Sequence, residues 1–259
     1  MKSLAELRVK IFADGADKAA MLEMYKNPII RGFTTNPTLM RNAGVQDYES
    51  FAREILTLIP DRPISLEVLA DDFGEMEDQA RTIAEFAENV FVKIPITNTK
   101  GASSAELVRR LSHSGIKLNV TALFTLEHVR MVTAAIAGGA PASVSVFAGR
   151  IADTGRDPMP IMSAAVEILG EVPSAELIWA SPRELLNIFQ ADAAGCHIIT
   201  ATNDILRKLH LLGKDLSDYS LETVRMFYSD ACASEFTIRA PERWRSASAG
   251  LKRRQAAGE

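Results

Sequence analysis

Short apolar runs rich in valine and isoleucine recur along the chain, and segments with apolar residues three and four positions apart lie between them. Runs of the first kind are typical of buried strands, and the spaced pattern is typical of amphipathic helices. The runs predict strands at residues 9–13, 29–34, 64–68, 90–94, 116–120, 142–147, 177–180 and 196–200. The clearest helical patterns cover residues 48–59, 73–87, 103–112, 126–137, 160–169 and 183–194. This alternation predicts a parallel sheet covered by helices.

Eight strand candidates, each followed by a helical segment, are the number that a (β/α)8 barrel needs, and 259 residues are enough to build one. The sequence therefore predicts an α/β fold, a single-domain TIM barrel. The alternative is an open doubly wound sheet, which a glycine-rich phosphate loop after the first strand would favour. The residues there, Phe12-Ala13-Asp14-Gly15-Ala16-Asp17, do not form the GxGxxG pattern.

Turn and cap signals agree with this division into elements. Gly32, Gly115 and Gly195 follow helical segments or precede strands, where a tight turn favours glycine. Ser103 is followed by a glutamate three residues later, which predicts a capped helix start. Thr125 precedes an acidic first turn and predicts another helix start.

The end of the chain divides into two parts. Apolar spacing over residues 220–236 predicts a last helix that packs on the barrel, so the barrel domain with its C-terminal helix is expected to cover residues 1–236. From residue 237 onward, six basic residues stand against two acidic ones and few apolar residues remain. We expect residues 237–259 to form a basic, flexible tail, with binding of an anionic partner as the alternative.

Composition narrows the classes of protein. The chain is 47% hydrophobic and 24% charged with a net charge of −4, which suits a soluble domain and no nucleic-acid partner. No apolar run approaches the roughly 18 residues of a membrane helix, and residues 1–10 lack the apolar segment of a signal peptide. Two cysteines without a CxxC pattern favour a reducing compartment. We expect a cytoplasmic protein without a membrane partner.

Histidine spacing gives no sign of a metal site. His113, His128, His197 and His210 form neither HExxH nor HxH, and no P-loop or GxSxG is present. We therefore expect neither a metal nor another cofactor.

A lysine stands inside the apolar run of residues 89–95, where Val92 and Ile94 flank Lys93. Burial there favours the neutral amine over the ammonium ion. A neutral amine is the form that attacks a carbonyl to give a Schiff base. The alternative is a lysine on an edge strand with its ammonium group in water.

Polar residues follow the predicted strands. The strand ends carry Asp14, Thr34–Asn36, Glu67, Lys93, Asn119 with Thr121, Ser145–Arg150, Ser181 with Arg183, and Thr200. In a barrel the carboxyl ends of all strands meet at one mouth, which holds the active site. Two carboxylates, a lysine, asparagine amides and guanidinium groups suit a phosphorylated polyol that reacts through an imine.

Several of these segments resemble the transaldolase family, which includes compact transaldolases and fructose 6-phosphate aldolases. Gly32-Phe33-Thr34-Thr35-Asn36-Pro37-Thr38-Leu39 resembles the family signature, and Val92-Lys93-Ile94-Pro95 resembles its Schiff-base lysine motif. Residues 119–121, 145–150, 180–183 and 194–200 resemble further blocks, in family order. The resemblance covers about residues 8 to 210 and implies a barrel of the class I aldolase type.

The resemblance also implies catalytic roles. Lys93 would form an imine with the C2 carbonyl of a ketose phosphate, and Asp14 would take the proton of the C4 hydroxyl. Glu67 with Thr121 would hold the water that carries protons. Seven further residues would bind substrate: Asn36, Asn119 and Ser145 at the hydroxyls of the retained dihydroxyacetone unit, Phe147 in the pocket beside it, and Arg150, Ser181 and Arg183 at the phosphate.

The chain departs from the family pattern at a few positions. Val146 and Ala148 stand where the family usually has Pro and Val, Trp179 replaces a small residue, and Pro182 lies between two phosphate ligands. These changes bear on the shape of the phosphate site. The loop at 96–104 is longer than in compact relatives and bears on the acceptor.

The resemblance implies a transaldolase of the pentose phosphate pathway that moves a dihydroxyacetone unit between sugar phosphates. The donors would be sedoheptulose 7-phosphate or fructose 6-phosphate, and the acceptors glyceraldehyde 3-phosphate or erythrose 4-phosphate. Relatives that release dihydroxyacetone have tyrosine and glutamine where this chain has Phe147 and Glu67, which favours transfer. An aldolase and a catalytically silent sugar-phosphate binder are the alternatives, and assembly into a homo-oligomer stays open.

Overall fold

The computed structural model describes residues 3–234 and 236–238, and within them eight parallel strands pair in chain order and close into a barrel. The strands are β1 (Lys10–Asp14), β2 (Ile30–Thr34), β3 (Ile64–Glu67), β4 (Val90–Pro95), β5 (Leu118–Leu123), β6 (Ala142–Val146), β7 (Ala175–Trp179) and β8 (Ile198–Thr202). Each predicted strand overlaps an observed one, and β1 pairs with β8 to complete the ring. The predicted TIM barrel is confirmed.

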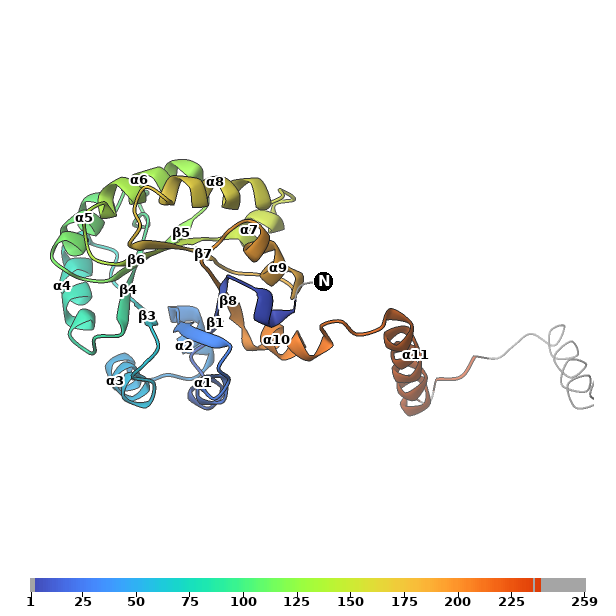
Figure 1. Ribbon diagram of the computed structural model, residues 1–259. Coiled ribbons are helices and arrows are strands. Elements are labelled where there is room, and N and C mark those ends of the chain that lie inside the picture. The colour runs from blue at the N-terminus through green and yellow to red at the C-terminus, as the bar shows by residue number, and fades with distance from the viewer. Residues whose placement is uncertain (1–2, 235, 239–259) are drawn as a thin grey trace, which may run out of the picture. The chain divides into compact units, whose positions relative to one another are not determined.

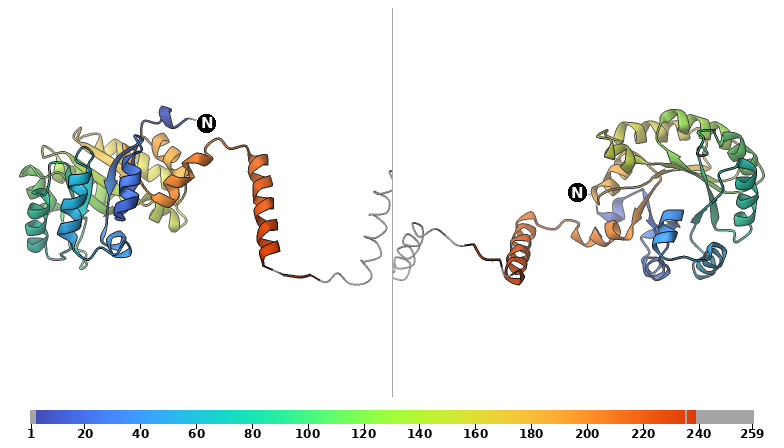
Figure 2. Two further views of the ribbon diagram at one scale, coloured as in Figure 1. Left: turned by 90° about the horizontal axis from the view of Figure 1, so that it is seen from below. Right: turned by 180° about the vertical axis from the view of Figure 1, so that it is seen from behind.

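Helices surround the strands on the outside (Figures 1 and 2). They are α1 (Lys18–Tyr25), α2 (Pro37–Asn42), α3 (Tyr48–Leu58), α4 (Phe73–Ala84), α5 (Ala105–His113), α6 (Leu126–Ile136), α7 (Ala148–Asp153), α8 (Met159–Leu169), α9 (Leu186–Ala193) and α10 (Asn203–Leu206), with 3-10 helices at Leu4–Glu6 and Arg207–Leu211. The six predicted helices match α3, α4, α5, α6, α8 and α9. The short helices α2 and α7 lie on the carboxyl side of β2 and β6, between each strand and a longer helix.

The chain divides into two units, Met1–His210 and Leu211–Glu259. Of the second unit, the structure describes residues 211–234 and 236–238, which include helix α11 (Leu216–Ala233). A last helix is therefore confirmed, although it begins and ends earlier than predicted. Its packing on the barrel stays a prediction, and most of the predicted basic tail at 237–259 lies outside the described residues.

The main hydrophobic core lies between the strands and the outer helices. Ile55 of α3, Leu66 of β3, Leu111 of α5 and Val132 of α6 are each fully buried in it. Inside the ring a smaller cluster joins Phe12 to Ile178 and Ile198. Burial of such side chains contributes roughly 1.5–3 kcal/mol each, so this double layer holds the barrel closed.

Two of the turn and cap predictions were wrong. Gly32 lies inside β2, and a Cβ atom there would come within 2.5 Å of the Phe12 ring, so glycine makes room for Phe12 in the barrel. Helix α5 begins one residue later than Ser103 predicted: Ser104 holds the cap position, its hydroxyl donates to the Pro95 carbonyl, and the Ser103 hydroxyl accepts from the Ala105 amide at 3.2 Å.

The other signals were right. Thr125 accepts a hydrogen bond from the amide of His128 at 3.2 Å and caps α6. Gly115 and Gly195 have φ angles of 90° and 80°, the left-handed region in which glycine avoids a steric penalty.

Candidate active site

A cavity of about 290 Å³ lies at the carboxyl ends of the strands. Its walls contain Asp14, Thr34, Asn36, Lys93, Asn119, Thr121, Ser145, Phe147, Arg150, Ala180, Ser181, Pro182, Arg183, Thr200, Thr202, Asp204 and Ile205. Ten of the eleven predicted site residues are among them, and the eleventh, Glu67, contacts Lys93. Parallel strands that close into a ring bring their carboxyl ends together, which explains why residues far apart in the sequence meet here.

Lys93 is buried inside the barrel, at 6% exposure. Its Nζ atom lies 2.9 Å from the Glu67 carboxylate and donates a hydrogen bond to the Thr35 carbonyl at 2.7 Å. The sequence predicted burial correctly, but the amine meets an anion and a carbonyl where its apolar neighbours suggested apolar surroundings. The Tyr48 hydroxyl donates to the Glu67 carbonyl at 2.8 Å and thereby anchors the end of β3.

Asp14 ends β1 beside the lysine. Its carboxylate accepts a hydrogen bond from the Thr34 hydroxyl at 2.7 Å, and Thr34 in turn contacts the Thr200 hydroxyl at 2.5 Å. Burial raises the pKa of the Asp14 carboxyl, while the charge of Lys93 and the bond from Thr34 oppose the rise. A carboxylate with a raised pKa binds a proton more strongly and is a better general base.

Asparagine and serine side chains form a buried polar network in the barrel. Asn119 donates from Nδ2 to the Ser65 hydroxyl at 3.0 Å and accepts from the Ser145 hydroxyl at 2.7 Å. Asn36 precedes α2, and its Oδ1 accepts the Leu39 amide hydrogen at 2.9 Å. This cap orients the Asn36 side chain and leaves its Nδ2 group to donate into the cavity that it lines.

Thr121 stands at an irregular point of β5. The pairing of β5 with β6 shifts between Val120 and Leu123, and Ala122 has a φ of 64°. Such bulges are common beside active sites, where they redirect a side chain. Thr121 is buried and lines the cavity with Lys93. Its role in holding water stays a prediction.

The Phe147 ring borders the cavity between β5 and α7, and Phe124 packs against it. The ring centroids of Phe147 and Phe124 are 5.7 Å apart, and the Arg150 guanidinium carbon lies 5.2 Å from the Phe147 ring centroid. The contact with the ring holds the Arg150 side chain along the wall of the cavity.

The segment after β7 is locked against helix α7. Ser181 has a φ of 60°, and its carbonyl oxygen lies 1.6 Å from where a Cβ atom of residue 149 would stand. Gly149 is therefore required at this contact, and its amide donates to the Ala180 carbonyl at 3.3 Å. Helix α7, with Arg150, and the segment with Ser181 and Arg183 are thus held together.

Arg183 is paired with Asp153, which sequence reasoning did not identify. Its Nε donates to Asp153 Oδ1 at 3.0 Å, and its Nη2 donates to Oδ2. The bond from Arg183 lowers the pKa of the Asp153 carboxyl. The signal in the sequence is the spacing Gly149-Arg150-Ile151-Ala152-Asp153, which places an anion three residues after a predicted phosphate ligand.

The departures from the family pattern fall into two groups. Val146, Ala148 and Trp179 are fully buried in the core between the strands and the helices. Pro182 lines the cavity. Trp179 does not line the cavity, because successive residues of a strand face opposite sides of the sheet. Whether these changes alter a phosphate site stays a prediction.

The loop after Lys93 is ordered as a short turn. Thr97 and Ser103 pair across it, and the Asp71 carboxylate accepts bonds from the Thr99 amide and hydroxyl, each at 2.7 Å. The Asn98 side chain accepts from the amides of residues 100 and 102. These bonds fix the loop against the connection between β3 and α4.

The described part of the chain was expected to bind no metal and to cross no membrane. Residues 3–234 and 236–238 contain no cluster of three or more His, Cys, Asp or Glu side chains that could hold a metal ion. Over the same residues, no helix combines the length and the apolar character needed to cross a membrane.

The fold and the cavity define the class. This is a (β/α)8-barrel protein with a buried lysine amine, two carboxylates and two guanidinium groups at the mouth where such barrels hold their active sites. Solved structures show the same fold at low identity. A 2,3-dimethylmalate lyase matches with a TM-score of 0.52 at 12% identity, covering 98% of this chain and 96% of that one. The structure titled KGPDC from Streptococcus mutans matches with a TM-score of 0.53 at 12% identity, covering 77% and 90%.

Sequence comparison identifies the family. Residues 11–244 match the family described as Transaldolase/Fructose-6-phosphate aldolase. A protein of Dehalococcoides mccartyi named "Probable transaldolase" is 36% identical over 202 residues, which cover 78% of this chain and 90% of that protein. Relatives with the same name from Methanococcus maripaludis and a Thermoanaerobacter species are 34% and 35% identical, covering 84% and 83% of this chain and 100% and 94% of theirs. The chain belongs to the transaldolase/fructose-6-phosphate aldolase family and is an enzyme of the transaldolase type.

Proposed function

We propose that the protein is a transaldolase that transfers a dihydroxyacetone unit from a ketose phosphate to an aldose phosphate through a Schiff base on Lys93. Sedoheptulose 7-phosphate and fructose 6-phosphate are the proposed donors, and glyceraldehyde 3-phosphate and erythrose 4-phosphate the acceptors. The observation that carries this proposal is the buried Lys93 amine beside Glu67, in a cavity whose walls also hold Asp14, Arg150 and Arg183.

The first step is imine formation. An amine attacks a carbonyl in its neutral form, so the Lys93 ammonium must first lose a proton. Glu67 Oε2 lies 2.9 Å from Nζ and is within reach to accept it. The amine then adds to the C2 carbonyl, and Glu67 returns the proton to the C2 oxygen to give a carbinolamine. Glu67 next carries a second proton from the nitrogen to this hydroxyl, which leaves as water held at Thr121, and a protonated imine remains on Lys93.

The second step breaks the C3–C4 bond. Asp14 takes the proton of the C4 hydroxyl, the bonding electrons move into the imine to form an enamine on Lys93, and the aldose phosphate leaves. The raised pKa of Asp14 suits this role because a stronger base takes a hydroxyl proton more readily. In the reverse sense, the enamine attacks an acceptor aldehyde, Asp14 returns the proton, and water hydrolyses the imine.

Binding of the substrate is assigned to the other side chains of the cavity. Asn36, Asn119 and Ser145 are placed to bond the hydroxyls of the unit that stays on Lys93. Arg150 and Arg183 supply positive charge for the phosphate, and Ser181 lies beside them.

The balance between transfer and release depends on water at the imine. An enamine that is protonated and hydrolysed releases dihydroxyacetone, whereas one that survives can attack an acceptor. Phe147 presents an apolar ring to the cavity and packs against Phe124, which keeps this wall without a hydroxyl group. An apolar wall disfavours an activated water and so prolongs the life of the enamine.

The test combines turnover with chemical trapping. Fructose 6-phosphate with erythrose 4-phosphate should give a seven-carbon product, and without the acceptor almost no dihydroxyacetone should appear. Borohydride with fructose 6-phosphate should label Lys93, and Lys93→Met should lose labelling and turnover while still folding. The matched control is Lys10→Met, which removes a lysine paired with Glu176 at the other end of β1 and should keep both.

Three results would contradict the proposal in different ways. Rapid release of dihydroxyacetone by the wild type without acceptor would make the protein an aldolase. Borohydride label on a lysine other than Lys93 would assign the Schiff base to that other lysine. Binding of sugar phosphate without labelling or turnover would leave a silent binder.

A further inference from the structure

Helix α7 and the segment after β7 meet at a charged pair as well as at their backbones. Arg183 forms a two-bond contact with the Asp153 carboxylate, and both side chains are about half exposed, at 48% and 50%. Gly149, four residues before Asp153, is pressed against the Ser181 carbonyl. The carboxylate therefore has a defined position relative to Arg183, because the backbones of the two segments are already in contact.

The contact occupies one edge of the guanidinium group. Arg183 uses Nε and Nη2 for Asp153. A planar guanidinium has five N–H donors in a rigid fork, so the edge formed by Nη1 and the second Nη2 hydrogen is turned away from Asp153. Arg183 lines the cavity, whereas Asp153 is not among the residues of its wall. Asp153 thus holds the side chain from behind.

The charges at this end of the cavity also balance in a particular way. Arg183 forms its bonds with Asp153, and the positive charge of Arg150 also lowers the pKa of the Asp153 carboxyl. Arg150, Arg183 and Asp153 together carry a net charge of one positive unit toward a phosphate dianion. Removing the Asp153 carboxylate would increase the net positive charge, but it would also free the Arg183 side chain to leave its orientation.

We propose that Asp153 is a positioning residue for the phosphate subsite, which holds Arg183 so that its outward guanidinium edge faces the substrate phosphate. This inference rests on the proposed function, in which Arg183 binds the phosphate. Asp153 then determines how strongly the enzyme prefers a phosphorylated sugar over an unphosphorylated one. We expect the loss of orientation to outweigh the gain in positive charge, so that removing Asp153 weakens phosphate binding. A guanidinium that samples several rotamers loses side-chain entropy each time it binds, whereas one that is held does not.

The test is the neutral, nearly isosteric substitution Asp153→Asn. We expect the KM for fructose 6-phosphate to rise about tenfold, because part of a charge-assisted contact is lost, with kcat within about twofold of the wild type. Trapping of dihydroxyacetone by borohydride, which involves no phosphate, should be unchanged. Calorimetry should show inorganic phosphate binding about tenfold more weakly, and this measurement needs no turnover.

Two further variants separate positioning from general stability. Glu176→Gln breaks the ion pair of Glu176 with Lys10, whose side chains are 38% and 40% exposed, and should change neither KM nor phosphate binding. In an Arg183→Ala background, Asp153→Asn should add less than about twofold, because Asp153 acts through Arg183. Thermal unfolding of every variant shows that each is folded.

The outcomes distinguish this inference from the proposed function. A wild type that does not act on fructose 6-phosphate refutes the proposed function, and the phosphate calorimetry still decides the role of Asp153. Unchanged or tighter phosphate binding by Asp153→Asn overturns the inference. So does a tenfold effect that persists without Arg183, or equal losses with fructose 6-phosphate and dihydroxyacetone.

Discussion

The reactivity of individual residues in this site depends on what stands next to them. Lys93 is buried, yet Glu67 at 2.9 Å compensates for the cost of its charge. Asp14 has a hydroxyl and a lysine nearby, yet burial outweighs them and raises its pKa. Phe147 is an aromatic ring with a guanidinium at its face and another ring at its side. Each of these balances can be shifted by one substitution.

Phe147→Tyr tests the role of the apolar wall. The new hydroxyl would stand at the cavity surface, where it can bind and orient a water for hydrolysis of the imine. We expect release of dihydroxyacetone from fructose 6-phosphate without acceptor to rise by roughly tenfold or more. An enzymatic assay for free dihydroxyacetone measures it.

Phe124→Tyr is the matched control for this change. Phe124 packs against Phe147 but is not among the residues of the cavity wall, so the same added hydroxyl should leave acceptor-independent release near the wild-type level. Equal rises in both variants would show that loosened packing, and not a hydroxyl in the cavity, admits the water.

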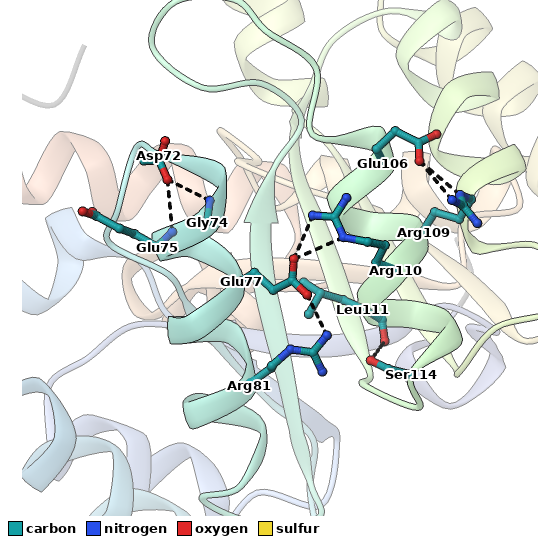
Figure 3. Close-up of polar contacts among 10 residues, drawn as sticks. All are labelled: Asp72, Gly74, Glu75, Glu77, Arg81, Glu106, Arg109, Arg110, Leu111 and Ser114. Atoms are coloured by element: carbon teal, nitrogen blue, oxygen red, sulfur yellow. Dashed lines mark hydrogen bonds and ion pairs between the residues drawn. The ribbon is translucent and has the colours of Figure 1, made fainter.

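At the scale of elements, a network of charged side chains joins the neighbouring outer helices α4 and α5, in addition to their packing in the core. Glu77 of α4 accepts from Arg81 on its own helix at 2.6 Å and from Arg110 of α5 at 2.8 Å (Figure 3). The Glu77 side chain is 21% exposed, less than either arginine. Both arginines lower the pKa of the Glu77 carboxyl, the bond from Arg110 most strongly. One carboxylate thus joins two neighbouring units of the barrel.

Glu77→Gln should lower the stability of the barrel by about 1 kcal/mol at neutral pH, which corresponds to about 2–4 °C in Tm for a chain of this size. Because the pKa of Glu77 is lowered by folding, its contribution is present above the pKa of the unfolded chain and is lost as the pH falls through the folded value. Thermal unfolding should therefore show the two proteins converging in acid.

Glu106→Gln provides the comparison within the same view. Glu106 pairs with Arg109 on one helix, its side chain is 75% exposed, and its loss should change Tm by less than about 1 °C (Figure 3). If Glu106→Gln lowered Tm as much as Glu77→Gln, any surface carboxylate would contribute equally. The link between α4 and α5 would then add nothing to stability.

At the scale of the whole molecule, the burial of the Asp14 carboxylate lowers the free energy of unfolding. The raised pKa of Asp14 means that the folded state disfavours the ionised carboxylate. The folded state binds the proton more tightly than the unfolded chain, so stability falls as the pH rises from the ordinary carboxyl range through the raised value. Active sites commonly carry such a cost because the reaction needs the charge.

Asp14→Asn should therefore raise the Tm at neutral pH while it removes turnover. The amide keeps the shape of the carboxyl group and carries no charge to bury. Since the wild-type cost disappears when Asp14 is protonated, the difference in Tm should shrink as the pH falls through the raised pKa of Asp14 and vanish below the ordinary carboxyl value. Scanning calorimetry between neutral pH and acid measures this convergence.

Asp71→Asn should behave in the opposite way. The Thr99 amide and hydroxyl lower the pKa of the Asp71 carboxyl, so its charge stabilises the folded loop, and its loss should lower Tm at neutral pH. A rise in Tm for both variants would indicate an effect of net charge and not of the individual partners.

The sequence by itself determined the strands and helices and the end of the barrel at which the candidate site residues lie. Eight Val- and Ile-rich runs predicted eight strands because the side chains of a strand or a helix repeat with its own period over a few residues. The polar residues after those runs predicted the cavity wall, since the ends of parallel strands share one mouth. The family is confirmed by comparison, while the catalytic and binding roles of Lys93, Asp14 and their neighbours stay predictions.

The tertiary structure alone decided which side chains pair. Lys93 with Glu67, Asp153 with Arg183, and Gly32 beneath Phe12 depend on strand register and on the contact of segments far apart in the chain. The helix start at α5 also differs from the prediction, because Ser104, whose hydroxyl donates to the Pro95 carbonyl at the end of β4, takes the cap position that the local signal gave to Ser103. Local sequence patterns predict the conformation of a few neighbouring residues. The free energy of a buried pair depends on how segments that are far apart in the sequence are positioned relative to each other.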